Sequence, residues 1–363
     1  MSIKGNKGEW SEFYAFIKIL TDKTIFAADE NLERMQNKFF TVLKIMREEA
    51  KIGRKTYDVT AKNDKITICD DKNKILAVVR ASKIKKSVNK VFEKMREGDD
   101  AAFSISLADS LMKDLLCTQI KASCGNKADL ILVIYDRISP TFPELGFSIK
   151  SMLGSPSTLL NASGATNFVY RIENLEDDKT EEINSAQGHS KLRDRSKIIY
   201  GSKGRLEFDG LENESFKKNL SMIDTALPEI LAELLKIYYN GKASSVPELV
   251  DVLCQNAELI AKYGLDKTAY EFKIKNFLVA VALGMTPNKE WDGFTKAHGG
   301  YIIVKEDGEI VCYHLYNRDQ FQNYLYKNTK LETPSTGRHK FGDVYREKGK
   351  KYIKLNLQIR FIK

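Results

Sequence analysis

Hydrophobic and polar positions along the chain follow spacings that predict both strands and helices. Residues 130–135, LILVIY, form a short continuous apolar run that predicts a buried strand. Residues 146–152 predict a second strand, and because side chains alternate along a strand, Ser148 and Lys150 share the face opposite its apolar side chains. Residues 157–162, which carry hydroxyl and amide side chains, predict a single helical turn. These neighbouring strands are the predicted centre of the fold.

The remaining pattern predicts elements on both sides of this centre. Helical spacing predicts helices over residues 8–20, 82–96, 107–116, 215–240 with a break near Pro228, 246–263, 268–283 and 318–327. Extended patterns predict strands at 39–46, within 57–79, at 198–200 and 206–208, in a hairpin of 301–304 with 309–315, and at 352–362. Polar segments predict loops at 174–190 and 333–342. Together these elements predict an α/β fold with a central mixed β-sheet flanked by helices and with additional helical and β elements.

Length and charge narrow the range of partners. The chain has 363 residues, 42% of them hydrophobic, which is enough for a sizeable core. A net charge of +9 favours a polyanionic partner, although many soluble proteins carry a similar charge. No apolar run of about 18 residues occurs, so no membrane span is expected. Five scattered cysteines without zinc-finger spacing, and an N-terminus without a signal-peptide pattern, predict a cytoplasmic protein with reduced thiols.

Asp129 and Lys150 are the first candidates for chemistry. Asp129 opens the first central strand and Lys150 lies on the second, so adjacent strands would bring the two side chains together. A carboxylate can bind Mg²⁺, and a lysine can orient a water and stabilise negative charge, which is the minimal equipment for metal-dependent phosphodiester hydrolysis. The alternative is structural, because any strand can begin with aspartate and any half-exposed strand can carry lysine.

Longer sequence motifs make the nuclease interpretation more specific. GFSIKSMLGSPSTLLNASGATNFVYRI in the middle, GNKGEWSEFYAFIKIL and AADENL near the N-terminus, and AHGGYIIVKEDGEIVCYHLYN, ETPSTGRHKFG and YIKLNLQIRFI near the C-terminus resemble the HpaII family of Type II restriction endonucleases. The resemblance covers essentially the whole chain. It implies a restriction-endonuclease-like core of the PD-(D/E)XK type, dependence on Mg²⁺, cleavage of double-stranded DNA, and recognition of CCGG.

The chain departs from the general core pattern of such nucleases at two positions. Ala128 stands where proline is usual, and Ser148 stands where the second acid is usual. Ser148 would therefore hydrogen-bond a water at the metal or take the place of that acid. The resemblance makes Glu9 and Glu12, on the predicted N-terminal helix, candidates for the missing metal ligand beside Asp129, with Glu144 as a third. The alternative for the two helical glutamates is stabilisation of a helix start.

Basic and polar segments supply the candidates for DNA contact. The stretch 189–208 alternates cations with glycine and serine, and arginine matches guanine in the major groove. A basic helix at 82–96 could bind phosphates, although a solvated helix face is the more common explanation. The DNA-contact candidates are Ser157, Thr158, Asn161, Arg193, Arg195, Lys197, Arg205, Arg338 and His339.

The combined hypothesis is a Type II restriction endonuclease in which Asp129, Lys150 and Ser148 are catalytic. Three regions are expected: residues 1–115 contribute a helix to the core, 116–215 form the catalytic core with a basic loop, and 216–363 form a helical block and a β-rich recognition or scaffold region. Double-stranded DNA is the expected partner, a homodimer is compatible with the sequence, and a cognate methyltransferase is expected in the same system. The alternatives are a non-catalytic DNA-binding protein with this fold and a DNA-repair nuclease.

Overall fold

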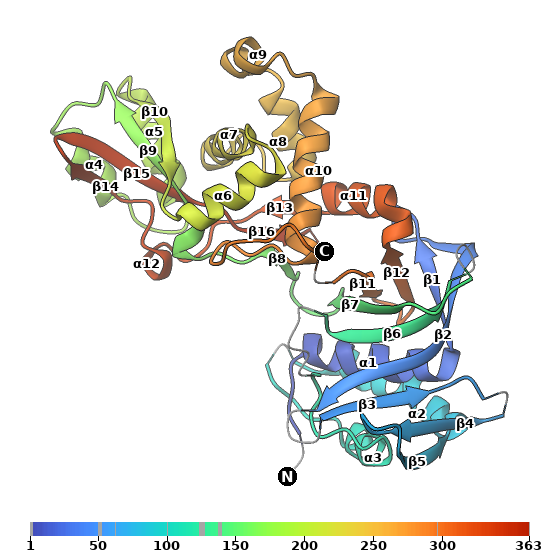
Figure 1. The fold of residues 1–363 in the computed structure, drawn as a ribbon. Coiled ribbons are helices and arrows are strands. Elements are labelled where there is room, and N and C mark those ends of the chain that lie inside the picture. Colours follow the sequence, from blue (N-terminus) through green and yellow to red (C-terminus); the bar gives the residue numbers. More distant parts are fainter. Residues whose placement is uncertain are drawn as a thin grey trace. The chain divides into compact units, whose positions relative to one another are not determined.

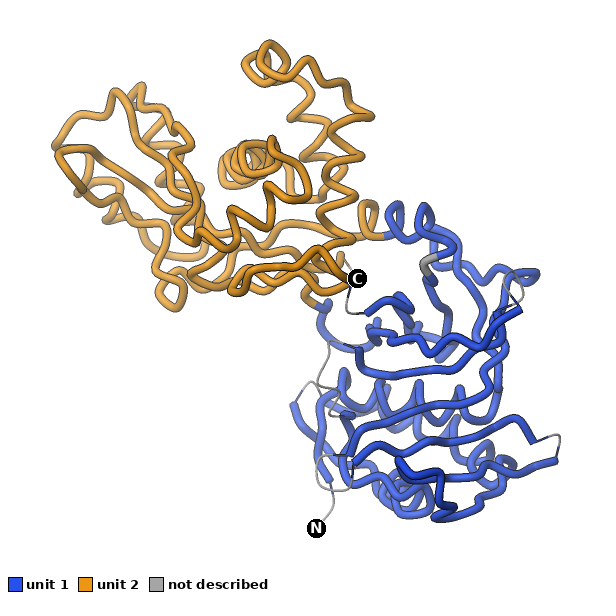
Figure 2. The backbone as a smooth tube through the Cα atoms, viewed as in Figure 1, with its two compact units in different colours: residues 1–157, 295–324, 363 blue, residues 158–294, 325–362 orange. Residues whose placement is uncertain are grey.

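The structure is a computed structural model that describes residues 3–49, 53–61, 63–99, 101–122, 128–136, 140–295 and 297–362. The chain forms two compact units (Figure 2). Unit 1 contains residues 1–157 and 295–324, and unit 2 contains residues 158–294 and 325–362. The chain therefore passes between the units repeatedly. The three regions expected at 1–115, 116–215 and 216–363 stay a prediction.

Unit 1 is built on a nine-stranded sheet with the order β1-β12-β11-β7-β6-β2-β3-β4-β5 (Figure 1). Strands β7 and β11 are parallel, as are β1 and β12, whereas the other neighbours are antiparallel, so the predicted central mixed sheet is confirmed. The strands are β1 Thr24–Ala28, β2 Arg34–Glu49, β3 Gly53–Asp58, β4 Lys65–Cys69, β5 Ile75–Arg80, β6 Leu130–Tyr135, β7 Glu144–Ser151, β11 Gly300–Val304 and β12 Ile310–His314.

Helices cover both faces of this sheet. Helices α1 (Lys7–Asp22), α2 (Ala81–Glu97) and α3 (Ser106–Asp114) share one apolar core with the inward residues of the strands. Helix α1 buries Phe13 and Phe16 without exposure to solvent, which fixes its rotation against the sheet. On the opposite face, aromatic rings of β11, β12 and α11 (Arg318–Lys327) stack on one another.

Unit 2 combines two small sheets with helices (Figure 1). One sheet has the order β10-β9-β15-β14 and the other β13-β16-β8. The strands are β8 Thr158–Leu160, β9 Asn167–Glu173, β10 Arg205–Leu211, β13 Thr329–Leu331, β14 Val344–Glu347, β15 Lys350–Asn356 and β16 Ile359–Phe361. The helices are α4 Lys179–Ser185, α5 Lys191–Gly201, α6 Glu214–Ile223, α7 Leu227–Tyr239, α8 Val246–Leu253, α9 Ala257–Tyr263, α10 Lys267–Leu283 and α12 Thr336–His339.

One long-range pairing overturns two predictions. Residues 157–162 do not form a helical turn, because Thr158–Leu160 is strand β8 and pairs antiparallel with β16. The predicted final strand 352–362 is divided, because β15 pairs with β9 whereas β16 pairs with β8 and β13 in another sheet. Hydrogen bonds from distant strands thus override local preference in both segments.

Helices replace other predicted segments of unit 2. The strand predicted at 198–200 lies inside α5, whose buried positions Leu192, Arg195, Ser196 and Ile199 have helical spacing. Two of these positions are polar, so the apolar pattern was incomplete. The predicted loops 174–190 and 333–342 contain the short helices α4 and α12.

Two findings bear on the general class of the protein. Within the described parts of the chain, every helix is too short or too polar to span a lipid bilayer. Cys69, Cys117, Cys254 and Cys312 are free thiols, and Cys124 lies outside the described residues.

Candidate active site

Asp129 is held against β7 by three hydrogen bonds. It directly precedes β6, and its backbone N–H donates to the Phe147 carbonyl at 2.8 Å. Its carboxylate Oδ2 accepts from the Ser148 hydroxyl at 3.0 Å and from the Ile149 backbone N–H at 2.8 Å. The structure therefore brings together Asp129 and the serine that stands at the usual acid position. The Ser148 hydroxyl donates to the Asp129 carboxylate, and this hydrogen bond fixes the orientation of the carboxylate.

Lys150 lies two residues further along the same strand and is half-buried. It is paired in register with Ile303 of β11, and its Nζ lies 5.7 Å from the centre of the Tyr301 ring. Burial lowers the pKa of Lys150, and the carboxylates of Asp129 and Glu12 partly oppose this shift. The cation is thus electrostatically coupled to both acids, as expected if the three side chains face one site.

Glu12 is the glutamate of α1 that joins this group. Its side chain is only 11% exposed, and its Oε1 lies 3.3 Å from the Lys121 ammonium. Burial and the negative charge of Asp129 raise its pKa to about 7, although Lys121 and Arg47 act in the opposite direction. Its other oxygen, Oε2, is buried without a hydrogen-bond partner among the described residues. Such an oxygen is costly unless another group binds it.

Glu9 has a different task on the same helix. Its Oε2 accepts a hydrogen bond from the Asn6 backbone N–H at 2.9 Å, while its own N–H donates to Asn6 Oδ1 at 3.0 Å. This reciprocal pair is a capping box that satisfies the helix start. The structure therefore gives Glu9 a structural partner and leaves Glu12 facing Asp129.

Glu144 lies at the other end of β7 from Lys150. Its carboxylate pairs with the Arg54 guanidinium and is half exposed. Its backbone carbonyl lies 3.1 Å from Nε2 of His298. This placement separates Glu144 from the acids that perturb Lys150.

A cavity of about 450 Å³ opens beside these groups at the N-terminal end of α1. Asp129 does not line the cavity itself. It is hydrogen-bonded to Ile149, which lines the cavity, and to Ser148, which directly precedes Ile149. The lining contains three lysines, two glutamates and three serines, as expected for a site that binds an anion and a cation together. The polar lining residues are Asn6, Lys7, Glu9, Glu12, Lys121, Lys150, Ser151, Ser155 and Ser157.

The donor set suits Mg²⁺ better than a transition metal. Within the described parts of the chain, no group of three or more His, Cys, Asp or Glu side chains is placed to hold a metal. Two carboxylates, Asp129 and Glu12, are electrostatically coupled here, and Glu12 has an unsatisfied oxygen. Mg²⁺ commonly binds through one or two carboxylates together with phosphate and water, so these residues fit that ion.

The structure places Arg195 in the interior of unit 2, which argues against the predicted DNA contact. Its side chain is 2% exposed and forms a 2.6 Å ion pair with Asp343. Its two terminal nitrogens also donate to the carbonyls of Gly342, Asn184 and Ala186. A base contact by this guanidinium would require the loss of those bonds, so its evident role is to join α5 to the segments around it.

The other DNA-contact candidates are more accessible. His339 and Thr158 are half-buried, and the backbone carbonyl of His339 accepts from Asn167 Nδ2 at 3.0 Å. Burial and the charge of Arg338 lower the pKa of His339. Ser157 lines the cavity of unit 1. The exposed candidates are Asn161, Arg193, Lys197, Arg205 and Arg338, all in unit 2.

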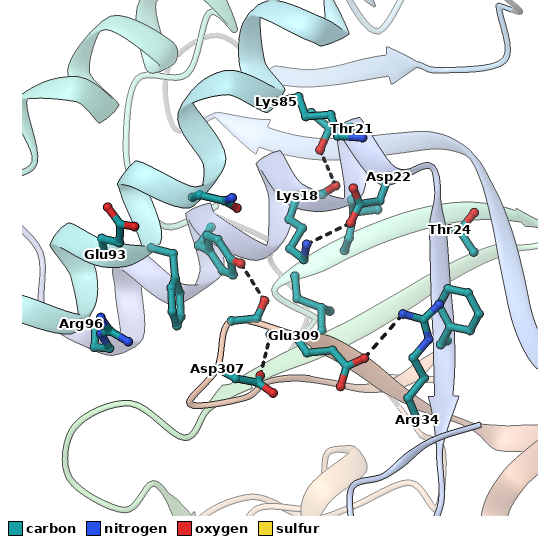
Figure 3. A pocket seen from close by; sticks show the side chains of 17 residues that line it. Lys18, Thr21, Asp22, Thr24, Arg34, Lys85, Glu93, Arg96, Asp307 and Glu309 are labelled. Carbon is teal, nitrogen blue, oxygen red and sulfur yellow. Dashed lines mark hydrogen bonds and ion pairs between the residues drawn. The ribbon is translucent and has the colours of Figure 1, made fainter. Parts of the chain in front are cut away.

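A larger hollow of about 720 Å³ lies at the C-terminal end of α1 (Figure 3). Asp129, Glu12 and Lys150 do not line it. Several of its charged side chains pair with one another, as Lys18 does with Asp22 at 3.1 Å and Arg34 with Glu309 at 3.6 Å. The smaller cavity, with its unsatisfied carboxylate oxygen, is therefore the stronger candidate for chemistry.

Comparison with known proteins gives this cavity its context. The model of the HpaII restriction endonuclease family matches residues 6–361. The Type II restriction enzyme HpaII of Haemophilus parainfluenzae is 40% identical over 371 aligned positions, which cover 99% of this chain and 98% of that enzyme. No solved structure matches the chain. The chain therefore belongs to the HpaII restriction endonuclease family, which confirms the family and the site-specific deoxyribonuclease activity predicted from its sequence motifs.

Proposed function

We propose that the protein cleaves double-stranded DNA at CCGG in the presence of Mg²⁺, using a PD-(D/E)XK-type core in which Glu12 replaces the missing second acid. The observation that carries this proposal is the buried, unpartnered Oε2 of Glu12 beside Asp129 and Lys150. Membership of the restriction endonuclease family supplies the reaction class and the DNA substrate, and the relative's name supports a short specific site.

Each residue then has a distinct role. Asp129 and Glu12 would hold the metal, which would neutralise charge on the phosphate and make water a better nucleophile. Lys150 donates to the phosphate and stabilises the negative charge that develops on its oxygens. Ser148 keeps the Asp129 carboxylate in place through its 3.0 Å hydrogen bond. The low-dielectric surroundings that lower the pKa of Lys150 also strengthen its attraction to phosphate.

Cleavage of plasmid DNA with Mg²⁺ and with EDTA tests the activity, and sequencing of the fragment ends tests the site. We expect a discrete set of fragments whose ends all derive from CCGG. Cleavage that follows mismatches or DNA structure would instead indicate a repair nuclease. Binding without cleavage under any divalent metal would indicate a non-catalytic DNA-binding protein and overturn the proposal.

A further inference from the structure

Lys121 is a second cation at the catalytic cavity, and no feature of the family core motif accounts for it. Its ammonium lies 3.3 Å from Glu12 Oε1, and its side chain is 57% exposed. It lines the same cavity as Lys150. We propose that Lys121 is a phosphate-binding residue of this active site, held on Glu12 until a divalent metal takes that carboxylate. The inference rests on the proposed function of the cavity.

A buried polar network fixes the backbone that carries Lys121. Arg47 and Glu49 of β2 form a 2.8 Å ion pair, with side chains 1% and 0% exposed. Arg47 Nη2 donates to the carbonyls of Gln119 and Ile120, the latter at 2.7 Å. Glu49 Oε2 accepts from the Thr118 backbone N–H at 2.8 Å. The chain is therefore held rigidly up to the residue before Lys121.

The next strand anchors the beginning of the same segment. The Tyr57 hydroxyl of β3 donates to the Leu115 carbonyl at 2.9 Å, and the Lys55 ammonium donates to the Leu116 carbonyl. Lys55 is 2% exposed, so this is a second buried cation used to bind backbone carbonyls. These hydrogen bonds fix the backbone of residues 115–120, as expected if Lys121 needs a defined position at the cavity.

The charges of the site explain when Lys121 would change partner. Two carboxylates, Glu12 and Asp129, face two ammonium groups, Lys121 and Lys150, and each of these side chains contributes to the pKa shifts of its neighbours. When Glu12 is ionised, the four formal charges cancel. A divalent cation bound to the carboxylates leaves an excess of two positive charges, which repels the exposed ammonium and favours phosphate.

Lysine suits this exchange because of its chemistry. Its ammonium is a compact charge with three donors on a flexible stem, so it can leave a carboxylate oxygen for a nearby phosphate oxygen. Lys150 is less suited to such movement, because its side chain is half-buried and its ammonium lies over the Tyr301 ring. We therefore expect the half-buried Lys150 and the exposed Lys121 to contact different oxygens of the bound phosphate.

Substitution of Lys121 tests this assignment by effects in opposite directions. In the absence of DNA, the Lys121→Ala variant should bind Mg²⁺ up to about fivefold more tightly than wild type at pH 9, because the ion pair that competes for Glu12 is lost. It should also lower the salt slope of DNA binding in Ca²⁺ by about one, as loss of one phosphate contact requires. Single-turnover cleavage should fall about 10- to 100-fold. Lys121→Arg should restore the salt slope.

Lys113→Ala, which removes an exposed lysine of α3 outside the cavity, is the matched control and should change none of these measurements. The assignment to Lys121 is overturned if Lys121→Ala keeps the wild-type salt slope. It is also overturned if the variant loses Mg²⁺ affinity together with DNA binding, which is the pattern of structural damage. Failure of the wild-type protein to cleave DNA would contradict the proposed function alone, because metal affinity and salt slope do not require cleavage.

Discussion

Glu12 in unit 1 and Arg195 in unit 2 are both buried charged side chains, but their surroundings differ in kind. Arg195 forms an ion pair and donates to three backbone carbonyls, and its Nε is the one atom of its guanidinium that is buried without a hydrogen-bond partner among the described residues. Glu12 has a single half-exposed ion-pair partner, an oxygen without a partner among the described residues, and a pKa raised to about 7 by burial and by Asp129. Burial with several partners indicates a stabilising group, whereas a buried carboxylate with one ion-pair partner and a raised pKa is typical of a functional site.

The largest effect should come from Asp129 and Lys150, the two central residues of the proposed active site. Asp129→Ala or Lys150→Ala should reduce cleavage by about 10³-fold or more while specific DNA binding in Ca²⁺ is largely retained. The Asp129→Ala substitution removes a proposed metal ligand and its hydrogen bonds to β7. The Lys150→Ala substitution removes the cation proposed to lie beside the phosphate. Single-turnover cleavage and binding of a cognate duplex measure the two effects separately. Wild-type turnover in either variant would remove this site from consideration.

Arg195 should instead matter for folding. Arg195→Ala should lower the free energy of unfolding by about 2–4 kcal/mol, because carbonyls that it satisfies are left without a donor. Arg193→Ala, two residues away and exposed, is the control and should change stability by less than about 0.5 kcal/mol. Urea denaturation measures both. Equal stability of the two variants would show that the contacts of Arg195 do not stabilise the fold, which would contradict the contrast with Glu12.

Glu12 should make stability depend on pH in the metal-free protein. Its pKa is raised from 4.5 to about 7, so the folded state binds a proton that the unfolded state releases, and stability is lost as pH rises through that window. The shift corresponds to about 3 kcal/mol above pH 7. Glu12→Gln should therefore be more stable than wild type at pH 8.5 in EDTA, match it near pH 4, and lose Mg²⁺-dependent cleavage.

Glu9→Gln is the control for that comparison. It should retain the cleavage rate and lose about 0.5–1 kcal/mol of stability through its weakened capping box. Equal and mild effects of the two substitutions on cleavage would favour Glu144 or a site with a single carboxylate.

The smallest effects should come from exposed cations of unit 2. Lys197→Ala and Lys203→Ala should weaken binding to all sequences alike, with a salt slope lower by about one for each phosphate contact. At least one of Arg193→Ala, Arg205→Ala and Arg338→Ala should lose about 1–3 kcal/mol on the cognate site only, because arginine can read guanine bidentately. Titration of cognate and random duplexes at two salt concentrations distinguishes the classes. An unchanged ratio in all three arginine variants would move sequence readout to residues 155–167.

The sequence predicted that Asp129 and Lys150 lie close together because the relevant rule is local, and their catalytic role stays a prediction. Alternation along β7 decides the face of Ser148 and Lys150, and the neighbouring strand brings Asp129 to them. The distinction between Glu9 and Glu12 was also within reach, since an asparagine three residues before Glu9 is a capping-box pattern.

Long-range contacts explain what the sequence did not predict. The burial of Arg195 depends on Asp343 and Gly342, far along the chain. Lys121 is an isolated cation in sequence, and only the network from Arg47 and Glu49 shows that its segment is held beside α1. No spacing rule connects residues at such separations, so neither role has a local signature.

The place of β11 in the sheet has a consequence for biosynthesis. Strand β7, which carries Lys150, has β6 on one side and β11 on the other, but β11 begins at Gly300, after residues 158–294 of unit 2. A ribosome that has made β6 and β7 has therefore made Asp129 and Lys150 without Tyr301, the ring against which Lys150 packs. Because β11 is synthesised after β6 and β7, a chain that ends before Gly300 contains Asp129 and Lys150 but lacks the strand that pairs with β7 on its other side.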